Sequence, residues 1–266
     1  MTDATGAVRL EMRGMTGGMT AVVTFDRPGA RNAMTWAMYE QLDEALDRVS
    51  AEVGIRVLVL RGAGGHFVAG TDIAQFADFT SGDDGVAYER RLDAVIAKLE
   101  ALPVATIAAV QGYAVGGGMA LATVCDLRIC TPDARFGVPI ARTVGNCLSL
   151  ANYARLVASF GAARTKAMLF TAELMRADEA RTLGYVVGVV ESDVLDAEVE
   201  TLAARIVAHA PITLQVTKDA IRRIVAGSLP EGDGGDDLVR RAYGSSDFRE
   251  GVAAFVEKRT PRWEGR

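Results

Sequence analysis

Histidine and cysteine are scarce in this chain. There are two histidines, His66 and His209, and three cysteines, Cys125, Cys130 and Cys147. Neither residue type shows the close spacing of metal ligands, and the cysteines form no CxxC pair, so we expect no metal site. The odd number of cysteines and their apolar surroundings predict reduced, buried thiols in a cytoplasmic protein.

Excess positive charge and long apolar runs are also missing. The chain has 29 Lys and Arg against 34 Asp and Glu, a net charge of -5, which argues against nucleic acid as the main partner. No apolar stretch approaches the roughly 20 residues of a membrane helix, and the N-terminus lacks the order of a signal peptide. Half of the 266 residues are hydrophobic, so the chain can bury a sizeable core.

Hydrophobic periodicity predicts alternating strands and helices in the first half of the chain. The expected elements are a hairpin of strands over 7–14 and 19–25, a helix capped by Thr35 and running to about Val49, a strand over 56–60, an exposed mobile loop over 80–85, a helix over 86–101 and a strand over 104–110. This order is typical of an α/β fold with parallel strands.

The pattern changes to almost pure helix near residue 192. Before that point we expect strands over 126–130, 134–137 and 185–190 and helices over 142–158, 161–170 and 177–183. After it we expect helices over 192–209, 212–226, about 235–243 and 245–258, with a loop over 229–235. The chain is therefore expected to divide into a core, residues 1–191, and a C-terminal helical region, residues 192–266.

Three consecutive glycines, Gly116, Gly117 and Gly118, join a buried strand to a helix. Such a junction exposes backbone N–H groups at the positive end of a helix, which suits an oxygen that becomes negative during a reaction. The alternative is a tight packing turn. No Gly-Lys-Ser/Thr follows the glycines and the spacing of a dinucleotide fingerprint is absent, so nucleotide-binding loops are not expected.

Short motifs spread along almost the whole chain resemble the crotonase family, also called the enoyl-CoA hydratase/isomerase family. The matching segments are residues 25–28 (FDRP), 31–33 (RNA), 67–73 (FVAGTDI), 103–112 (PVATIAAVQG), 116–118 (GGG), 125–128 (CDLR), 136–139 (FGVP), 177–180 (ADEA), 184–186 (GYV) and 250–259 (EGVAAFVEKR). Each motif is loose alone, but together, in this order and at the family's spacing, they are highly specific.

The resemblance implies a crotonase-type α/β spiral of ββα units followed by a C-terminal helical trimerisation region. It also implies homotrimers, commonly stacked as hexamers, and an acyl-CoA thioester as ligand. CoA would enter as part of the substrate, so the family needs no separate cofactor.

The resemblance further assigns roles to residues of two loops. The family's two oxyanion N–H donors correspond to Thr71 and Gly117, and Lys258 matches a position that meets the CoA phosphates, often from a neighbouring subunit. The expected substrate-binding residues are Arg27, Ala69, Gly70, Thr71, Asp72, Ile73, Ala74, Gly117 and Lys258.

The sequence departs from the family at the two catalytic glutamates. Those positions are Ala120 and Ile140, which can neither hold a water molecule by a hydrogen bond nor transfer a proton. Losing one positioned general acid or base typically lowers a rate by about 10²–10⁴-fold. Ordinary two-glutamate hydration is therefore not expected.

Other side chains are candidates to replace the glutamates. Asp72 lies beside an oxyanion donor, and Arg142, Asn146 and Cys147 follow Ile140 on the segment that faces the acyl pocket in the family. Each also has a structural interpretation, because Asp72 can fix its loop and the other three can cap or pack a helix. We expect structural roles for the remaining polar candidates, namely His66, Tyr113, Asp126, Tyr153 and His209.

Two classes of function follow. In the first, an acyl-CoA enzyme relies on enolate stabilisation for decarboxylation, hydrolysis, isomerisation or weak hydration, and Ala120 and Ile140 shape an apolar pocket for a branched, cyclic or aromatic acyl group. In the second, the protein binds acyl-CoA without turnover. An RNA-binding role is disfavoured by the acidic balance.

Overall fold

The computed structural model describes residues 6–227, 241 and 244–266 of the chain. The predicted loop over 229–235 lies outside the described residues, as does almost all of the predicted helix over 235–243. None of the helices among the described residues is long and apolar enough to cross a membrane.

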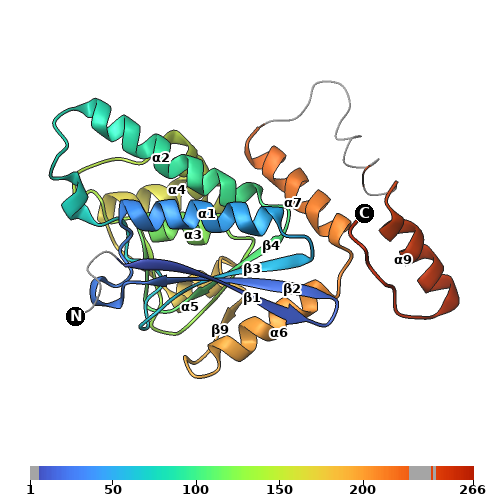
Figure 1. The fold of residues 1–266 in the computed structure, drawn as a ribbon. Helices are drawn as coiled ribbons and strands as arrows, with labels where there is room; N and C mark the ends of the chain where they lie inside the picture. Colours follow the sequence, from blue (N-terminus) through green and yellow to red (C-terminus); the bar gives the residue numbers. More distant parts are fainter. Residues whose placement is uncertain (1–5, 228–240, 242–243) are drawn as a thin grey trace.

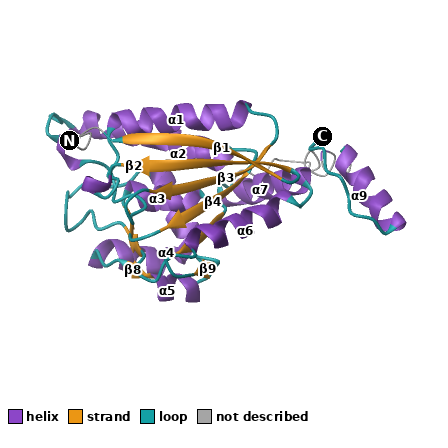
Figure 2. Cartoon of the chain, turned by 60° about the horizontal axis from the view of Figure 1, so that its bottom comes forward, coloured by secondary structure: helices purple, strands orange, loops and turns teal. Residues whose placement is uncertain are grey.

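A twisted sheet forms the centre of the fold (Figures 1 and 2). Its strands, in spatial order, are β1 (Ala7–Met15), β2 (Gly18–Asp26), β3 (Ile55–Gly62), β4 (Ala105–Val110), β6 (Leu127–Cys130) and β9 (Gly188–Val189). Only the β1–β2 hairpin is antiparallel, and each later pair is parallel. A smaller sheet contains β5 (Tyr113–Val115), β7 (Arg135–Gly137) and β8 (Met175–Arg176). The predicted α/β class with parallel strands is confirmed.

Helices cover both faces of the large sheet (Figure 1). The helices among the described residues are α1 (Trp36–Ala51), α2 (Gly82–Ala101), α3 (Gly117–Val124), α4 (Leu150–Thr171), α5 (Ala177–Thr182), α6 (Leu195–Val207), α7 (Pro211–Val225) and α9 (Ser246–Glu257), with short 3-10 turns η1 (Pro28–Ala30) and η2 (Ile73–Phe76). A strand that is buried on both faces reads as a continuous apolar run, which explains the sequences of β3 and β4.

Helix α1 forms as its sequence predicts. Thr35 is the N-cap, and its side chain accepts a hydrogen bond from the Met38 N–H. The predicted apolar stripe, Met38, Leu42, Ala45, Leu46 and Val49, is buried against the sheet. The opposite face of the sheet packs on α6, where Leu195, Val199 and Ala203 meet strand residues such as Val57 and Ile107.

The predicted loop over 80–85 is wrong in part, because α2 already begins at Gly82. Ser81 and Asp84 form a capping box there, in which each side chain bonds the other residue's backbone N–H. A Ser-x-x-Asp spacing is a sequence signal for this arrangement. The first turn of α2 was therefore readable from the chain.

The predicted helix over 142–158 is wrong in its first half. Residues 142–149 form turns and coil, and α4 begins only at Leu150, with Ser149 accepting a hydrogen bond from the Asn152 N–H. Gly145 has φ = +76°, which a right-handed helix does not allow. The segment that follows Ile140 is consequently a surface loop.

Two smaller expectations also need correction. The predicted strand over 185–190 shrinks to Gly188–Val189, because Tyr185 and Val186 turn into the core after Gly184, where φ is +72°. Cys147 is exposed, whereas Cys125 and Cys130 are buried as expected, and burial raises the pKa of each buried thiol to about 12.

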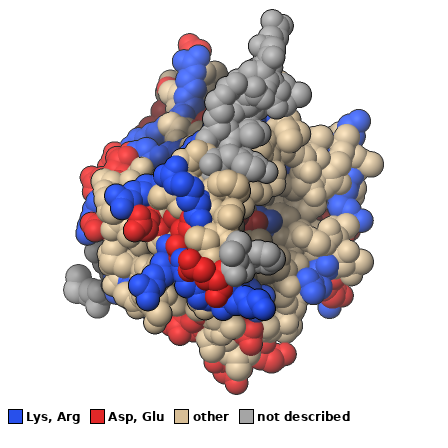
Figure 3. Space-filling view, turned by 90° about the vertical axis from the view of Figure 1, so that its right-hand side faces the viewer, with Lys and Arg blue, Asp and Glu red and all other residues tan. Residues whose placement is uncertain are grey.

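The C-terminal helices α7 and α9 lie at one end of the molecule (Figure 1). Trp263 donates from Nε1 to the Ala208 carbonyl at 3.0 Å, and Asp247 accepts from the Glu264 N–H at 2.7 Å, so the final residues fold back beside α9. On the face seen in Figure 3, Lys and Arg side chains intermix with Asp and Glu side chains.

Candidate functional site

Two glycine-containing loops meet at the N-terminal end of α3. Gly70 (φ = +101°) and Gly116 (φ = +56°) both have left-handed backbones, and a Cβ on Gly116 would lie 3.6 Å from the Gly70 Cα. Val68 ties the loops together, because its N–H donates to the Tyr113 carbonyl at 2.9 Å and its carbonyl accepts from the Val115 N–H at 3.0 Å. Segments more than 40 residues apart thus form one wall.

The other two glycines of the triplet are required by close packing. A Cβ on Gly118 would lie 2.0 Å from the Val68 carbonyl oxygen, a contact that no side chain can make. A Cβ on Gly117 would lie 2.6 Å from the Tyr39 hydroxyl. The sequence allowed two interpretations of these glycines, a tight packing turn or a source of exposed N–H groups. In the structure the same glycines pack tightly and also form the uncapped N-terminal end of α3.

Two backbone N–H groups of this wall have no partner among the described residues. Thr71 pairs with Met34 in a parallel bridge, in which the Met34 N–H donates to the Gly70 carbonyl at 2.8 Å and the Met34 carbonyl accepts from the Asp72 N–H at 2.9 Å. The Thr71 N–H therefore points away from Met34. Gly117 is the first residue of α3, and the first N–H groups of a helix have no partner within the helix.

The Thr71 hydroxyl lies between two tyrosine hydroxyls. Its Oγ1 is 2.8 Å from the Tyr39 hydroxyl of α1 and 3.0 Å from the Tyr88 hydroxyl of α2. Burial raises the pKa of Tyr39 well above its usual range and that of Tyr88 to about 12, so both phenols stay protonated at neutral pH. Neither tyrosine could be recognised from the sequence, because nothing local distinguishes them from other core aromatic residues.

Asp72 is held by structural contacts. One carboxylate oxygen accepts from the Ala74 N–H at 3.1 Å and caps η2, and the other forms an ion pair with Arg27 at 2.8 Å. These contacts match the structural interpretation of Asp72. The next two residues, Ile73 and Ala74, are exposed and leave the stretch after the wall open to a ligand.

Ala120 lies in the first turn of α3, where its N–H donates to the Gly116 carbonyl at 3.1 Å, and Ile140 follows three residues after Gly137, whose carbonyl accepts from the Gly116 N–H at 2.9 Å. Both side chains are partly buried against the main hydrophobic cluster. A cavity of about 10 Å³, near the smallest volume that holds a water molecule, lies beside Ala120. Of the polar groups lining it, Asn152 donates to Asp93 at 3.0 Å and Arg155 pairs with Glu100 at 2.8 Å. The polar groups nearest Ala120 are thus already engaged.

The candidates that follow Ile140 are spread over the surface loop. Arg142, Asn146 and Cys147 are all exposed, and none makes a described side-chain contact with Thr71 or Gly117. The loop ends at Ser149, whose N–H donates to the Glu89 carboxylate at 2.9 Å. Burial and the nearby Asp93 raise the pKa of Glu89, a residue that the sequence analysis did not single out.

Lys258 does not reach this wall within its own chain. It is exposed at the end of α9, at the opposite end of the molecule from the segment that precedes α2 (Figure 1). His66 packs on the Tyr113 ring with centroids 5.3 Å apart, and the Tyr153 hydroxyl is 3.5 Å from the Leu148 N. These contacts fit the structural roles expected for His66, Tyr113 and Tyr153.

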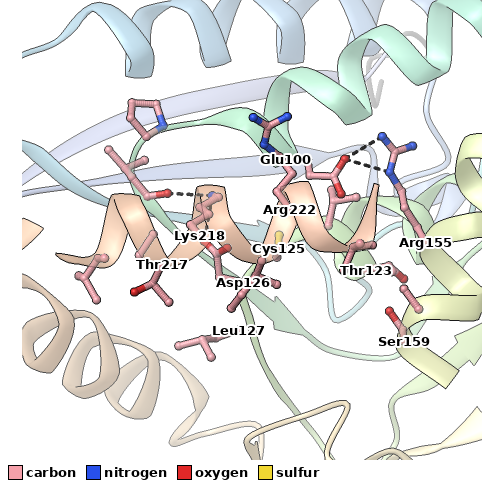
Figure 4. Close-up of a pocket in the computed structure, with 18 of the residues that line it drawn as sticks. Glu100, Thr123, Cys125, Asp126, Leu127, Arg155, Ser159, Thr217, Lys218 and Arg222 are labelled. Atoms are coloured by element: carbon pink, nitrogen blue, oxygen red, sulfur yellow. Dashed lines mark hydrogen bonds and ion pairs between the residues drawn. The ribbon is translucent and has the colours of Figure 1, made fainter. Parts of the chain in front are cut away.

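A larger cavity of about 470 Å³ opens at the other end of α3, beneath α7 (Figure 4). Four of its charged groups, Lys218 with Asp126 and Arg155 with Glu100, are paired with one another. Lys218 contacts Asp126 at 2.9 Å and the Val104 carbonyl at 3.0 Å, and Arg155 binds Glu100 through two nitrogens. The contacts of Asp126 agree with the structural role expected of it, and no glycine of the wall is among the residues that line this cavity.

Comparison with known proteins gives the family. The sequence profile of the enoyl-CoA hydratase/isomerase family matches residues 16–266. The chain belongs to the enoyl-CoA hydratase/isomerase family. The resemblance to crotonases inferred from the motifs is thereby confirmed.

Individual relatives cover nearly the whole chain. The short-chain-enoyl-CoA hydratase of Clostridium acetobutylicum is 33% identical over 247 residues, covering 91% of this chain and 93% of the relative. The 2,3-dehydroadipyl-CoA hydratase of Escherichia coli is 32% identical over 246 residues, covering 92% and 95%. The crystal structure of an enoyl-CoA hydratase/carnithine racemase from Magnetospirillum magneticum superposes with a TM-score of 0.89 at 34% identity, covering 100% of this chain and 97% of the other.

Proposed function

We propose that this enoyl-CoA hydratase/isomerase family member binds an acyl-CoA thioester and stabilises its enolate between the N–H groups of Thr71 and Gly117. One observation carries the proposal. Both N–H groups lack a partner among the described residues, and they belong to loops so close that a Cβ on Gly117 would lie 3.5 Å from Thr71 Oγ1. The positive end of α3 adds to the stabilisation of a negative oxygen.

The reaction does not follow the two-glutamate route, because Ala120 and Ile140 cannot position or activate water. Decarboxylation suits such a site. The bond between the α-carbon and the carboxylate breaks, its electron pair enters the thioester enolate, and CO2 leaves without a protein base. Isomerisation and hydrolysis are the alternative reactions at the same oxyanion hole.

The acyl group is expected to be branched, cyclic or aromatic. The apolar side chains of Ala120 and Ile140 favour such a group, and aromatic rings lie close to Thr71. The Tyr88 ring packs on Trp36 and Phe76 with centroid distances of 5.6 and 4.9 Å. These rings offer flat apolar surface beside the proposed oxyanion hole.

Binding of the CoA moiety involves the exposed stretch from Ala69 to Ala74, with Arg27 supporting it through Asp72. Lys258 reaches the CoA phosphates of a neighbouring subunit in a homotrimer, which can stack into a hexamer. The position of α9 at the far end of its own chain supports a contribution to another subunit (Figure 1). In this proposal, residues 192–266 are the trimerisation region.

The first test follows crotonyl-CoA hydration by loss of the conjugated-thioester absorbance. The natural protein is expected to show little turnover, and the double variant Ala120→Glu/Ile140→Glu is expected to gain it. Clear hydration by the natural protein would contradict the proposed loss of the glutamate route. Branched and carboxylated thioesters are then screened for CO2 release, and binding without any turnover would identify a silent acyl-CoA binding protein.

The second test isolates the Gly117 N–H with a matched pair. In a Tyr39→Phe background, which removes the atom nearest to a new Cβ, Gly117→Ala keeps the N–H and Gly117→Pro deletes it. Acetoacetyl-CoA serves as probe, since its enolate has its own absorbance. The proline variant should raise the pKa of bound acetoacetyl-CoA by about 2 units relative to the alanine variant, the equivalent of one oxyanion donor. Equal values would refute the oxyanion assignment.

A further inference from the structure

Three hydroxyl groups from distant parts of the chain form a hydrogen-bonded row beside the oxyanion wall. Tyr39 comes from α1, Thr71 from the glycine-containing loop and Tyr88 from α2. The row runs from Tyr39 to Thr71 (2.8 Å) and on to Tyr88 (3.0 Å). Because Thr71 carries both the central hydroxyl and the proposed oxyanion N–H, the row lies next to the reacting thioester.

Counting protons shows that one O–H of this row is not used. Three hydroxyls supply three protons, and two hydrogen bonds use two of them. Tyr39 is 2% exposed, and Thr71 is the only described partner of its hydroxyl, so Tyr39 donates to Thr71 rather than leave a buried donor unpaired. The remaining free proton belongs to Thr71 or to Tyr88.

Tyr88 is the end of the row that a ligand can approach. Its side chain is only partly buried, and its ring is fixed by contacts with Trp36, Phe76 and Phe79. If each hydroxyl donates to the next, from Tyr39 through Thr71, the O–H of Tyr88 is left to donate outward. Hydrogen bonds in such a row polarise one another and strengthen the terminal donor.

We propose that Tyr88 is the proton donor for the enolate, in place of the glutamates that are absent at Ala120 and Ile140. In the step, the Tyr88 O–H bond breaks and a C–H bond forms at the α-carbon. The electron pair of the enolate becomes the new C–H bond, and the negative charge passes to the Tyr88 oxygen. A proton from water then restores the phenol. This assignment rests on the proposed oxyanion hole, and Thr71 and Tyr39 act as positioning residues.

The protonation states of the two phenols agree with this direction of transfer. Burial raises the pKa of Tyr88 to about 12, so the group is present as an acid at neutral pH. The phenolate formed by the step is a strong enough base to recover a proton from water. The same raised pKa makes Tyr88 a poor base for removing an α-proton, which suits a reaction whose enolate arises by another bond cleavage.

A pH jump with acetoacetyl-CoA tests the proton donor without knowledge of the natural substrate. The ligand is bound as its enolate at alkaline pH, the solution is brought by rapid mixing to a pH well below the measured pKa of the bound ligand, and protonation at carbon is followed as loss of the enolate absorbance. Replacing a positioned acid, Tyr88→Phe, should slow this decay by about 100-fold or more. Tyr113→Phe is the matched control, because it removes a tyrosine hydroxyl outside the row.

Variants of Thr71 separate the hydroxyl from the backbone donor. Thr71→Val keeps the N–H and the shape of the side chain but interrupts the row, so its decay should be slower than that of Thr71→Ser, which keeps a hydroxyl. Tyr39→Phe should have the smallest effect, because Thr71 and Tyr88 still leave one proton free. These pairs remain informative even if one variant folds poorly.

The outcomes distinguish this proposal from the oxyanion hole on which it rests. If Tyr88→Phe decays at the natural rate while the Gly117 pair still differs in enolate pKa, Tyr88 is not the donor and the oxyanion hole stands. If the natural protein does not favour the bound enolate at all, both assignments fail. If Tyr88→Phe slows the decay but the Gly117→Ala and Gly117→Pro variants have the same enolate pKa, the oxyanion hole is refuted. The proposal that links Tyr88 to this oxyanion hole is then refuted as well.

Discussion

The two ends of α3 are built in opposite ways. At the C-terminal end, Arg128 donates from Nη1 to the carbonyls of Ala122 (3.0 Å), Thr123 (3.3 Å) and Cys125 (2.6 Å), which the helix itself leaves without donors. At the N-terminal end, glycines bring the backbone close to its neighbours, and no described side chain caps the helix. One end is satisfied internally, and at the other the first N–H groups of the helix have no side-chain cap among the described residues.

The difference separates a stabilising network at the C-terminal end of α3 from the proposed oxyanion hole at its N-terminal end. Next to the closed end, Asp126 accepts from the Thr106 N–H at 2.7 Å, from its hydroxyl at 2.9 Å and from Lys218 at 2.9 Å. That network joins α7 to the sheet. Only the two turns of α3 separate this network from the N-terminal end of the helix. The network is therefore a rigid support directly behind the proposed oxyanion hole.

The largest effect on stability is expected from removing Arg128 at the C-terminal end of α3. Arg128→Met removes the donor of three helix-terminal carbonyls, and the free energy of unfolding should fall by about 3 kcal/mol. Urea unfolding followed by circular dichroism measures the change. Arg176→Met is the control, because that side chain is 67% exposed and its loss should change stability by no more than about 0.5 kcal/mol. Equal midpoints for Arg128→Met and the natural protein would show that water replaces the guanidinium.

A somewhat smaller effect is expected from adding one carbon at the open end. Gly118→Ala places a Cβ 2.0 Å from the Val68 carbonyl, so the backbone must shift, and about 2 kcal/mol of stability should be lost. Gly82→Ala, in the first turn of α2 with open space around it, should instead gain about 0.5 kcal/mol. The same denaturation experiment compares the two. A stable Gly118→Ala protein that still binds acetoacetyl-CoA would mean that the wall tolerates separation of its loops.

The third prediction concerns pH and the loop that follows Ile140. Burial raises the pKa of Glu89 in the folded state. At pH values between the ordinary pKa of glutamate and this raised pKa, the folded state therefore holds a proton that the unfolded state has lost. Stability therefore falls as pH rises through this range. Glu89→Gln keeps an acceptor for the Ser149 N–H and stays neutral. Its melting temperature relative to the natural protein should rise steadily with pH, and parallel curves would contradict the assignment.

The last prediction concerns the reactivity of the three thiols and involves no change in stability. A chromogenic disulfide reagent should modify one thiol per native chain, Cys147, because Cys125 and Cys130 are buried and burial raises their pKa values to about 12. All three should react in denaturant. Fast labelling of Cys125 in the native protein would show that the closed end of α3 opens readily.

Much of the architecture was readable from local patterns. The Thr35 cap, the apolar stripe of α1 and the β1–β2 hairpin all follow from neighbouring residues, and the structure confirms them. The loop after Ile140 was not recognised, because the apolar spacing of residues 142–149 resembles a helix while Gly145 adopts φ = +76°. Helical periodicity does not report whether a single residue allows the helix to continue.

The sequence alone determined the family, the α/β class, the two glycine-containing loops and the absence of glutamate at Ala120 and Ile140, because these properties reside in residue identity and local order. The family resemblance already placed the two loops at one site, but only the tertiary structure decided that Tyr39, Thr71 and Tyr88 share a row of hydrogen bonds. The physical reason is that hydrogen bonds between segments distant in sequence produce no periodic pattern of residues in the sequence. They exist only once the sheet and its helices have packed.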